Sequence, residues 1–304
     1  MSTLRGLVLI IFLFSGQTVF AGLLTIYLIP SAAGYNFASP RTFAGSTARN
    51  YRSGAVQPYS HAMYHLKCSK TDGDTFEHDE LSGVNIAALS YGNSFVLRRG
   101  YGLGTLFASM PGKMETRDEV IYNLRTYMPD GSVSFLQYKI SSETCGRLTQ
   151  FTNEYRERGL DRLYGQSARP RYGEGSNCTA FVTALLELAG LADDTIDRIW
   201  RRVYLVPSYL VGGPLTGNFI PPRRFLLRPF LTKHWASPNQ PHFAAEIYNT
   251  DNLHFHILSR WNQGLSPFDT GNLPVTLSYI ENIKGFIIDA RTVPTPMASM
   301  WLSR

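Results

Sequence analysis

The chain has 304 residues, 44% of them hydrophobic and 13% aromatic, so it can bury a sizeable core. Its formal net charge of +6 includes no long run of like charges. The sequence lacks a glycine-rich phosphate loop, a CxxC pair, an HExxH motif and any known nucleic-acid-binding module. We therefore expect no cofactor, no bound metal and no nucleic-acid partner.

The first 29 residues contain a single charged side chain, that of Arg5. The apolar run from Leu7 to Phe14, followed by the small residue Ala21, is typical of a secretory signal peptide with its cleavage site. Alternatively, the uncharged stretch from Gly6 to Ile29 is long enough to cross about 30 Å of hydrocarbon as an uncleaved anchor. Both interpretations predict an exported protein, in the periplasm or another extracytoplasmic compartment, and the second predicts that it stays attached to the membrane.

The next part of the chain changes from a loop-like composition to strand patterns. Residues 30–57 are rich in Ser, Ala, Gly, Pro and Arg, which predicts a linker or a loop lying over the domain. Residues 61–68 then alternate as a β-strand does, which places His61 and His65 on one face. Similar patterns predict strands at 84–91, 94–98 and 133–140, a helix or strand at 119–127, and a helix from 141 to 159.

The chain has three cysteines, Cys68, Cys145 and Cys178. In an exported protein an odd number leaves one thiol unpaired or bonded to another chain. We favour a Cys68–Cys145 disulfide with Cys178 free, although the sequence does not establish which pair forms. The alternative is three reduced, buried thiols.

The stretch from Gly173 to Leu191 predicts a helix that begins at Cys178. Its apolar residues recur with a period near 3.6, and Ser176, Asn177 and Thr179 are all suitable N-cap residues. The positive end of the helix dipole favours a thiolate there, and the free N–H groups of the first turn can hold an oxyanion. Cys178 is therefore either a nucleophile or a buried structural thiol. The presence of a partner histidine beside it would favour the nucleophile.

The C-terminal third predicts a helix followed by a proline-rich segment and more strands. The expected elements are a helix at 193–204, loops and short elements at 207–241, paired strands at 242–248 and 253–258 around a turn, and a strand at 285–290. Two basic pairs, Arg201–Arg202 and Arg223–Arg224, lie near aromatic residues. They suit either a solvated face or contact with an anionic membrane surface.

The order of these parts resembles a known family. A strand bearing SHA at 60–62, a segment ending in SYG at 90–92, a glycine-rich stretch, a helix with Glu143 and the pair Asn177-Cys178 follow one another between residues 58 and 191. This order resembles the Lnb-type periplasmic domain of unknown function. That group is similar to the circularly permuted papain-like thiol enzymes, of which lecithin–retinol acyltransferase is a relative. The resemblance implies that Cys178 is a nucleophile and that His61, which precedes it in the chain, is its base.

Thiol acyl transfer also needs a group that orients the imidazole of the base. His65 shares the face of His61, and Asn85 lies on the next predicted strand; both are possible orienting residues.

A rival assignment keeps Cys178 and changes the histidine. The stretch PHFAAEIYNTDNLHFHI, at residues 241–257, is similar to the strands of papain-like cell-wall endopeptidases whose histidine follows the cysteine. In that arrangement His242 is the base, and His254 or His256 orients it.

These observations together predict an α+β fold: an antiparallel sheet packed on helices, forming a permuted papain-like core with a C-terminal extension. The expected parts are a signal peptide or anchor at 1–29, a linker at 30–57, the core at 58–191 and an extension at 192–304 that completes the same domain. The expected function is a thiol acyltransferase, amidase or other hydrolase that forms an acyl-enzyme on Cys178. Its expected partners are an envelope lipid, lipoprotein or peptide substrate and the membrane surface. The alternatives are a peptidoglycan endopeptidase and a non-catalytic envelope scaffold.

Overall fold

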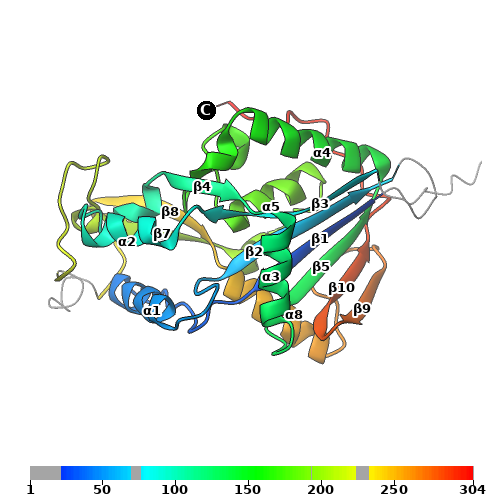
Figure 1. The fold of residues 1–304 in the computed structure, drawn as a ribbon, viewed down its shortest axis with the longest axis horizontal. Coiled ribbons are helices and arrows are strands. Elements are labelled where there is room, and N and C mark those ends of the chain that lie inside the picture. Colours follow the sequence, from blue (N-terminus) through cyan, green and yellow to red (C-terminus); the bar gives the residue numbers. More distant parts are fainter. Residues whose placement is uncertain (1–21, 70–76, 193, 224–232, 304) are drawn as a thin grey trace, which may run out of the picture.

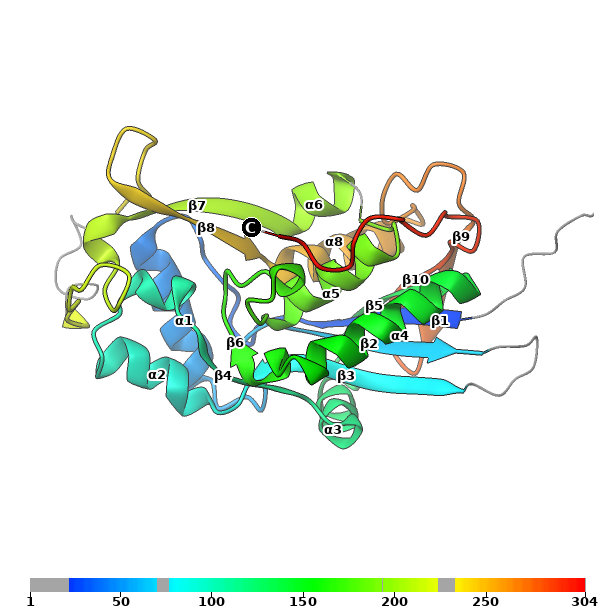
Figure 2. The same cartoon turned by 90° about the horizontal axis from the view of Figure 1, so that it is seen from above.

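A large, mostly antiparallel sheet organises the molecule and makes its class α+β, as the sequence predicts (Figures 1 and 2). The computed structural model describes residues 22–69, 77–192, 194–223 and 233–303. The eight strands lie in the order β6-β4-β3-β2-β1-β5-β10-β9, and only the β5–β10 pair is parallel. Their bounds are β1 Gly22–Ile29, β2 His61–Cys68, β3 His78–Ile86, β4 Met110–Met114, β5 Ser134–Ile140, β6 Leu163–Tyr164, β9 Val275–Ile280 and β10 Ile283–Asp289.

Helices cover both faces of this sheet, and a separate two-stranded ribbon extends from one end. The described residues form seven α-helices: α1 Pro40–Arg52, α2 Leu89–Leu97, α3 Arg117–Tyr127, α4 Ser142–Glu157, α5 Cys178–Leu188, α6 Asp194–Trp200 and α8 Thr250–Asn262. Short 3-10 turns include η1 Leu103–Phe107, η2 Leu160–Arg162, η3 Pro170–Tyr172 and η4 Ser208–Leu210. The ribbon pairs β7 Arg201–Pro207 with β8 His242–Tyr248.

Most of the core lies on the two faces of the sheet, and a smaller buried cluster lies between η1, η4 and the β7–β8 ribbon. One face packs the alternate residues of the central strands against α4, α5 and α8, and Tyr64, Phe151 and Phe181 are fully buried there. The other face packs Met63, Phe135 and their neighbours against α3, whose buried residues include Val120. Because α5 begins on one face and α3 on the other, groups that meet at the end of the sheet can come from both layers.

The first described residues correct the expected N-terminal boundary at residue 29. Gly22–Ile29 is not part of a leader or anchor but the strand β1, paired with β2 on one side and β5 on the other. Leu24, Ile26, Leu28 and Ile29 are all fully buried. A strand buried on both faces is a continuous apolar run, so its sequence looks the same as the end of a membrane segment. The rest of that prediction, residues 1–21 with the cleavage site at Ala21, lies outside the described residues.

Several local predictions are confirmed and others are wrong. The strands at 61–68, 133–140, 242–248 and 285–290 and the helix at 141–159 are present within one or two residues. The range 30–57, expected to be a linker, contains α1, which a Ser39–Thr42 capping box begins. The expected strands at 84–91 and 94–98 are wrong: β3 ends at Ile86, and Leu89–Leu97 forms the helix α2. Short apolar runs such as these fit either a strand or a helix. The helix expected at 193–204 ends at Trp200, where β7 begins.

The expected strand at 253–258 is also wrong, because these residues lie in α8. Asn249, taken from the sequence as part of a turn, is the N-cap of this helix and accepts hydrogen bonds from the backbone of Asp251 and Asn252. Leu253 and Ile257, four residues apart, then form its buried face. The strand that pairs with β8 is β7 instead.

Cys68 and Cys145 form a disulfide, with 5.8 Å between their Cα atoms, as we favoured from the sequence. The bond joins the end of β2 to the first turn of α4. Cys178 is free and buried.

We expect loss of this disulfide to destabilise the fold without affecting Cys178. The bond closes a loop across a sequence separation of 77 residues, so Cys68→Ala/Cys145→Ala should lower the free energy of unfolding by about 2–4 kcal/mol in urea denaturation. Iodoacetamide labelling of the denatured, unreduced wild type, read by mass spectrometry, should modify one thiol, that of Cys178. Labelling at Cys68 or Cys145 would contradict the pairing.

Candidate functional site

Cys178 is the first residue of α5, held in place by a fully engaged N-cap. The side-chain oxygen of Asn177 accepts hydrogen bonds from the backbone N–H of Ala180 at 2.8 Å and from Thr179 Oγ1 at 2.7 Å. The Asn177 amide also donates to the carbonyl of Gln166 at 2.6 Å. Asn177 is buried, so this cap is rigid. It confirms the predicted helix start and fixes the position of the thiol.

The first turn of α5 leaves two backbone donors beside the thiol. Among the described residues, the N–H groups of Cys178 and Thr179 have no hydrogen-bond partner, whereas the next two amides bond to Asn177. They lie at the positive end of the helix dipole. This is the arrangement that stabilises an oxyanion formed on a carbonyl carbon attacked by the neighbouring sulfur.

His61 is the histidine that the structure brings to Cys178. Its imidazole lies close enough to Cys178 for the thiol to influence its pKa, and its Nε2 lies 2.6 Å from Glu115 Oε2. Because Nε2 faces the carboxylate, Nδ1 is the ring nitrogen left for the sulfur. His61 is the first residue of β2, so it lies at the end of the sheet, where Glu115, just before α3, and Cys178, at the start of α5, can both reach it.

The electrostatics of this chain favour a charged imidazole. Burial by itself lowers the pKa of His61, but the charge of Glu115, the interaction with Cys178 and the hydrogen bond to Glu115 outweigh burial and raise it to about 10. For Glu115 the signs are reversed. Burial by itself raises its pKa, but the charge of His61 and the hydrogen bond to it lower the pKa below its ordinary value. Both shifts favour an ionised Glu115–His61 pair at neutral pH.

Glu115 orients His61, and sequence reasoning missed it. Its side chain is only 3% exposed, and its Oε1 accepts from the amides of Asn85 and Asn123, both at 3.2 Å. Gly83 leaves the necessary space, since a Cβ there would lie 2.5 Å from Glu115 Oε2. In the sequence Glu115 is followed by Arg117, Asp118 and Glu119, so it looks like part of a solvated helix start and carries no signal of its burial.

Neither of the two orienting residues expected from the sequence is hydrogen-bonded to His61. His65 bonds to Asp79, with Nε2 2.5 Å from Oδ1, near the surface four residues further along β2. Asn85 acts one step away, because it holds Glu115 rather than the imidazole.

The histidines of the rival assignment lie apart from Cys178. His242 begins β8, opposite Pro207, and its Nδ1 contacts the carbonyl of Gln240 at 2.7 Å; the other end of the same strand, at Tyr248, lies near the thiol. His254 is buried against Ser134 Oγ at 3.0 Å, and burial lowers its pKa to about 4. His256 bonds to the carbonyl of Pro267. The structure therefore does not assemble a base and orienting pair from these three residues.

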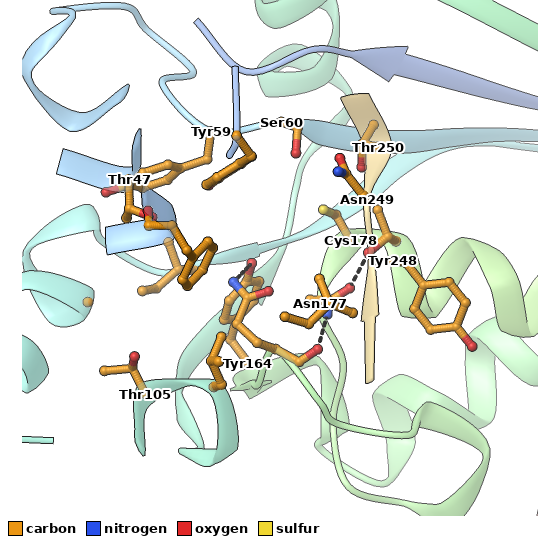
Figure 3. Close-up of a pocket in the computed structure, with 18 of the residues that line it drawn as sticks. Thr47, Tyr59, Ser60, Thr105, Tyr164, Asn177, Cys178, Tyr248, Asn249 and Thr250 are labelled. Atoms are coloured by element: carbon orange, nitrogen blue, oxygen red, sulfur yellow. Dashed lines mark hydrogen bonds between the residues drawn. The ribbon is translucent and has the colours of Figure 1, made fainter. Parts of the chain in front are cut away.

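A cavity of about 200 Å³ lies beside Cys178. Figure 3 shows Cys178, Asn177, Ser60, Asn249 and Thr250 together at one end of this space and Thr47 and Thr105 at the other. Much of the remaining wall is apolar and comes from the N-terminal loop, α1, α2, η1 and β4: Phe37, Phe43, Leu89, Val96, Leu106 and Met110. The cavity is thus polar at the thiol and mostly apolar away from it, where Thr47, Asn93 and Thr105 are polar exceptions.

The polar end of the cavity also offers groups that could contact a substrate. Thr250 Oγ1 is buried and makes no hydrogen bond with the described residues, so a polar atom of a bound substrate would satisfy it. Tyr164 lines the same end and accepts a hydrogen bond from Gln166 at 3.2 Å. Burial, followed by the proximity of Cys178, raises the pKa of Tyr164 well above its ordinary value, so the phenol is neutral.

Comparison with family models, with curated proteins and with solved structures finds no match for this chain. Within the described ranges, no three His, Cys, Asp or Glu side chains are grouped so as to hold a metal ion. The helices of those ranges include none long and apolar enough to cross a membrane.

We expect Glu115→Gln to change how stability depends on pH. A pKa of His61 raised from 6.5 to about 10 stabilises the folded state fully below about pH 6.5, and this contribution is lost as the pH rises toward 10. Without the carboxylate charge the pKa of His61 falls. The free energy of unfolding, measured in urea, should therefore decline more steeply between pH 6.5 and 10 for the wild type than for Glu115→Gln.

Glu119→Gln is the matched control for this experiment. It removes a partly exposed carboxylate from the start of α3 whose partners are Lys113 and Thr116 rather than a histidine. Its slope over the same pH range should equal that of the wild type. Equal slopes for all three proteins would show that Glu115 does not set the charge of His61.

Proposed function

We propose that the protein is a cysteine-dependent acyltransferase, amidase or other hydrolase that forms an acyl-enzyme on Cys178. The observation that carries the proposal is the chain of contacts Cys178–His61–Glu115 at a helix N-terminus with two unpaired backbone donors. Nucleophile, base, orienting group and oxyanion donors are the four parts that thiol acyl transfer requires. The order of histidine before cysteine supports a permuted papain-like core.

The reaction follows from this geometry. Cys178 attacks the substrate carbonyl carbon as a thiolate, its proton being held by His61, and the N–H groups of Cys178 and Thr179 stabilise the negative oxygen. His61, protonated in the resting ion pair, gives its proton to the leaving group as the C–N or C–O bond breaks and the thioester forms. Water or an amine then attacks the thioester and loses its proton to His61, and the thiolate leaves. Attack by water makes a hydrolase; attack by an amine makes an acyltransferase.

The cavity supports a substrate with an apolar part. Its polar end surrounds the thiol, and its apolar walls would bury hydrocarbon next to the reacting carbonyl. Together with the resemblance to Lnb-type domains, this favours an envelope lipid, a lipoprotein or a long-chain amide, handled at a membrane surface outside the cytoplasm. A peptidoglycan peptide is more polar, and His242, which the endopeptidase alternative requires, lies apart from the thiol.

The decisive experiment follows the rate of Cys178 alkylation by iodoacetamide against pH, with hydrolysis of p-nitrophenyl esters as a measure of turnover. His61→Ala removes the imidazolium that stabilises the thiolate, so alkylation near neutral pH should fall. Ester turnover should fall on the order of a hundredfold or more, the usual contribution of a positioned base. Cys178→Ser should abolish both while preserving the fold.

His242→Ala is the matched control and should leave alkylation and turnover unchanged. His61→Gln, which fills the buried site, guards against simple unfolding of His61→Ala and should show the same losses. An effect of His242→Ala with none at His61 would instead support the endopeptidase arrangement. An inert Cys178 in the folded wild type would support the scaffold.

We expect the apolar part of the cavity to select for chain length. Val96 lines it from α2, so Val96→Trp should fill space and reduce kcat/KM for a p-nitrophenyl ester of a long acyl chain roughly tenfold or more relative to the acetate ester. Leu277→Trp, at a position on β9 that is 41% exposed, should leave the ratio unchanged. An unchanged ratio in Val96→Trp would place the acyl chain elsewhere.

A further inference from the structure

Acidic residues are unevenly distributed along this chain. None of the 23 Asp and Glu residues lies in 1–71, 81–114 or 198–245, although these three stretches include many of the arginines. The described parts of these stretches contain α1, α2, η1 and β7. Figures 1 and 2 place α1, α2 and the far end of the β7–β8 ribbon together at one end of the molecule. The segments that form this end therefore contribute arginines and no carboxylates, which gives it a net positive charge.

A compact part of this end combines arginines with exposed apolar side chains. At the C-terminal end of α2, Leu97 is 60% exposed, and Arg98 and Arg99 are exposed beside it. Residues 212–220 pack directly on the following turn, since the Ile220 N–H donates to the Gly100 carbonyl at 2.7 Å. These elements define a docking surface, whose exposed residues are Leu97, Arg98, Arg99, Leu215 and Phe219.

Within the described part of the chain, the two arginines of the docking surface have no carboxylate partner. Among the ion pairs of the described residues, none includes Arg98 or Arg99, and Arg99 instead lies over the ring of Phe95, 4.8 Å from its centroid. The apolar members are large: Leu215 is 51% exposed and Phe219 is 61% exposed. Unpaired cations among exposed aromatic and aliphatic side chains are what an anionic lipid interface attracts and buries.

The same helix that carries this surface also forms the cavity wall. Val96 faces the cavity and Leu97, the next residue, faces solvent. On α1, likewise, Thr47 lines the cavity while Arg49 is exposed. A membrane in contact with this end would therefore lie next to the part of the cavity that is distant from Cys178.

We propose that the docking surface binds the headgroups of an anionic lipid bilayer, with Arg98 and Arg99 contacting phosphate and Leu97, Leu215 and Phe219 entering the interface. Lipid binding by this surface does not depend on the proposed function, whereas delivery of an acyl chain from the bilayer to Cys178 rests on it. Loss of lipid binding and loss of thiol chemistry are measured separately, so one can fail without the other.

The test is hydrogen–deuterium exchange of the full chain with vesicles. Peptides covering residues 95–101 and 213–220 should gain protection with vesicles containing phosphatidylglycerol and not with phosphatidylcholine alone. This readout reports on the docking surface whether or not another part of the chain also contacts lipid. Each basic residue near an anionic surface contributes about one kcal/mol, so the lipid concentration for half-maximal protection should rise about thirtyfold or more in Arg98→Glu/Arg99→Glu. Salt should weaken the protection in the wild type.

Arg125→Glu/Arg162→Glu is the matched control, since it makes the same change in charge at two exposed arginines outside the docking surface. It should retain wild-type protection. Leu97→Ser/Phe219→Ser should also lose protection, which separates interfacial insertion from charge attraction alone. All variants should keep the wild-type rate of Cys178 alkylation. Equal protection on neutral vesicles, or unchanged protection in Arg98→Glu/Arg99→Glu, would overturn the proposal.

Discussion

The buried contact between Glu115 and His61 is the constraint on which the candidate site depends. Removing two charges from water costs several kcal/mol for each ion, and close pairing repays this only where the remaining lone pairs are also satisfied. Here the second oxygen of Glu115 is held by amides from β3 and α3, and the backbone of Glu115 accepts from Ser82 at 2.7 Å. The position of the carboxylate therefore requires three elements to be correctly placed together: β3, the end of β4 and α3.

This dependence explains why the candidate site lies at the end of a sheet rather than on one of its faces. A residue in the middle of β2 faces either the α5 layer or the α3 layer. His61, as the first residue of the strand, reaches a thiol from one layer and a carboxylate from the other. The charged groups are thereby confined to a small region, and the neighbouring α1–α2 wall of the cavity carries no charged side chain.

The sequence predicted those parts of the site that local patterns determine. The capped helix start at Cys178, the strand that begins at His61 and the Cys68–Cys145 bond are all present. Glu115 was missed because its burial arises from packing between β3 and α3, whereas its local sequence resembles an exposed helix start. The permuted order was preferred over His242 on motif resemblance, and only the folded structure shows which histidine lies at the thiol.

The errors in the predicted secondary structure also arise from tertiary packing that the local sequence does not reveal. In 253–258 the alternation of His254, Phe255 and His256 imitates a strand, but the Asn249 cap and the buried pair Leu253 and Ile257 produce a helix. In β1 an apolar run that suits a membrane segment is instead the centre of the sheet. In both cases tertiary packing, and not local preference, selects the structure.

The parallel pairing of β10 with β5 has a consequence for how the chain folds. Ser134 at the start of β5 pairs with Lys284, so this edge of the central sheet stays uncovered until the chain has been made as far as β10, about 150 residues later. Contacts between such distant residues slow folding, and an unpaired strand edge meanwhile invites pairing with other chains. A ribosome-bound chain can assemble β1 to β5 but cannot cover the free edge of β5. That edge is therefore exposed to aggregation until β10 has been synthesised and pairs with it.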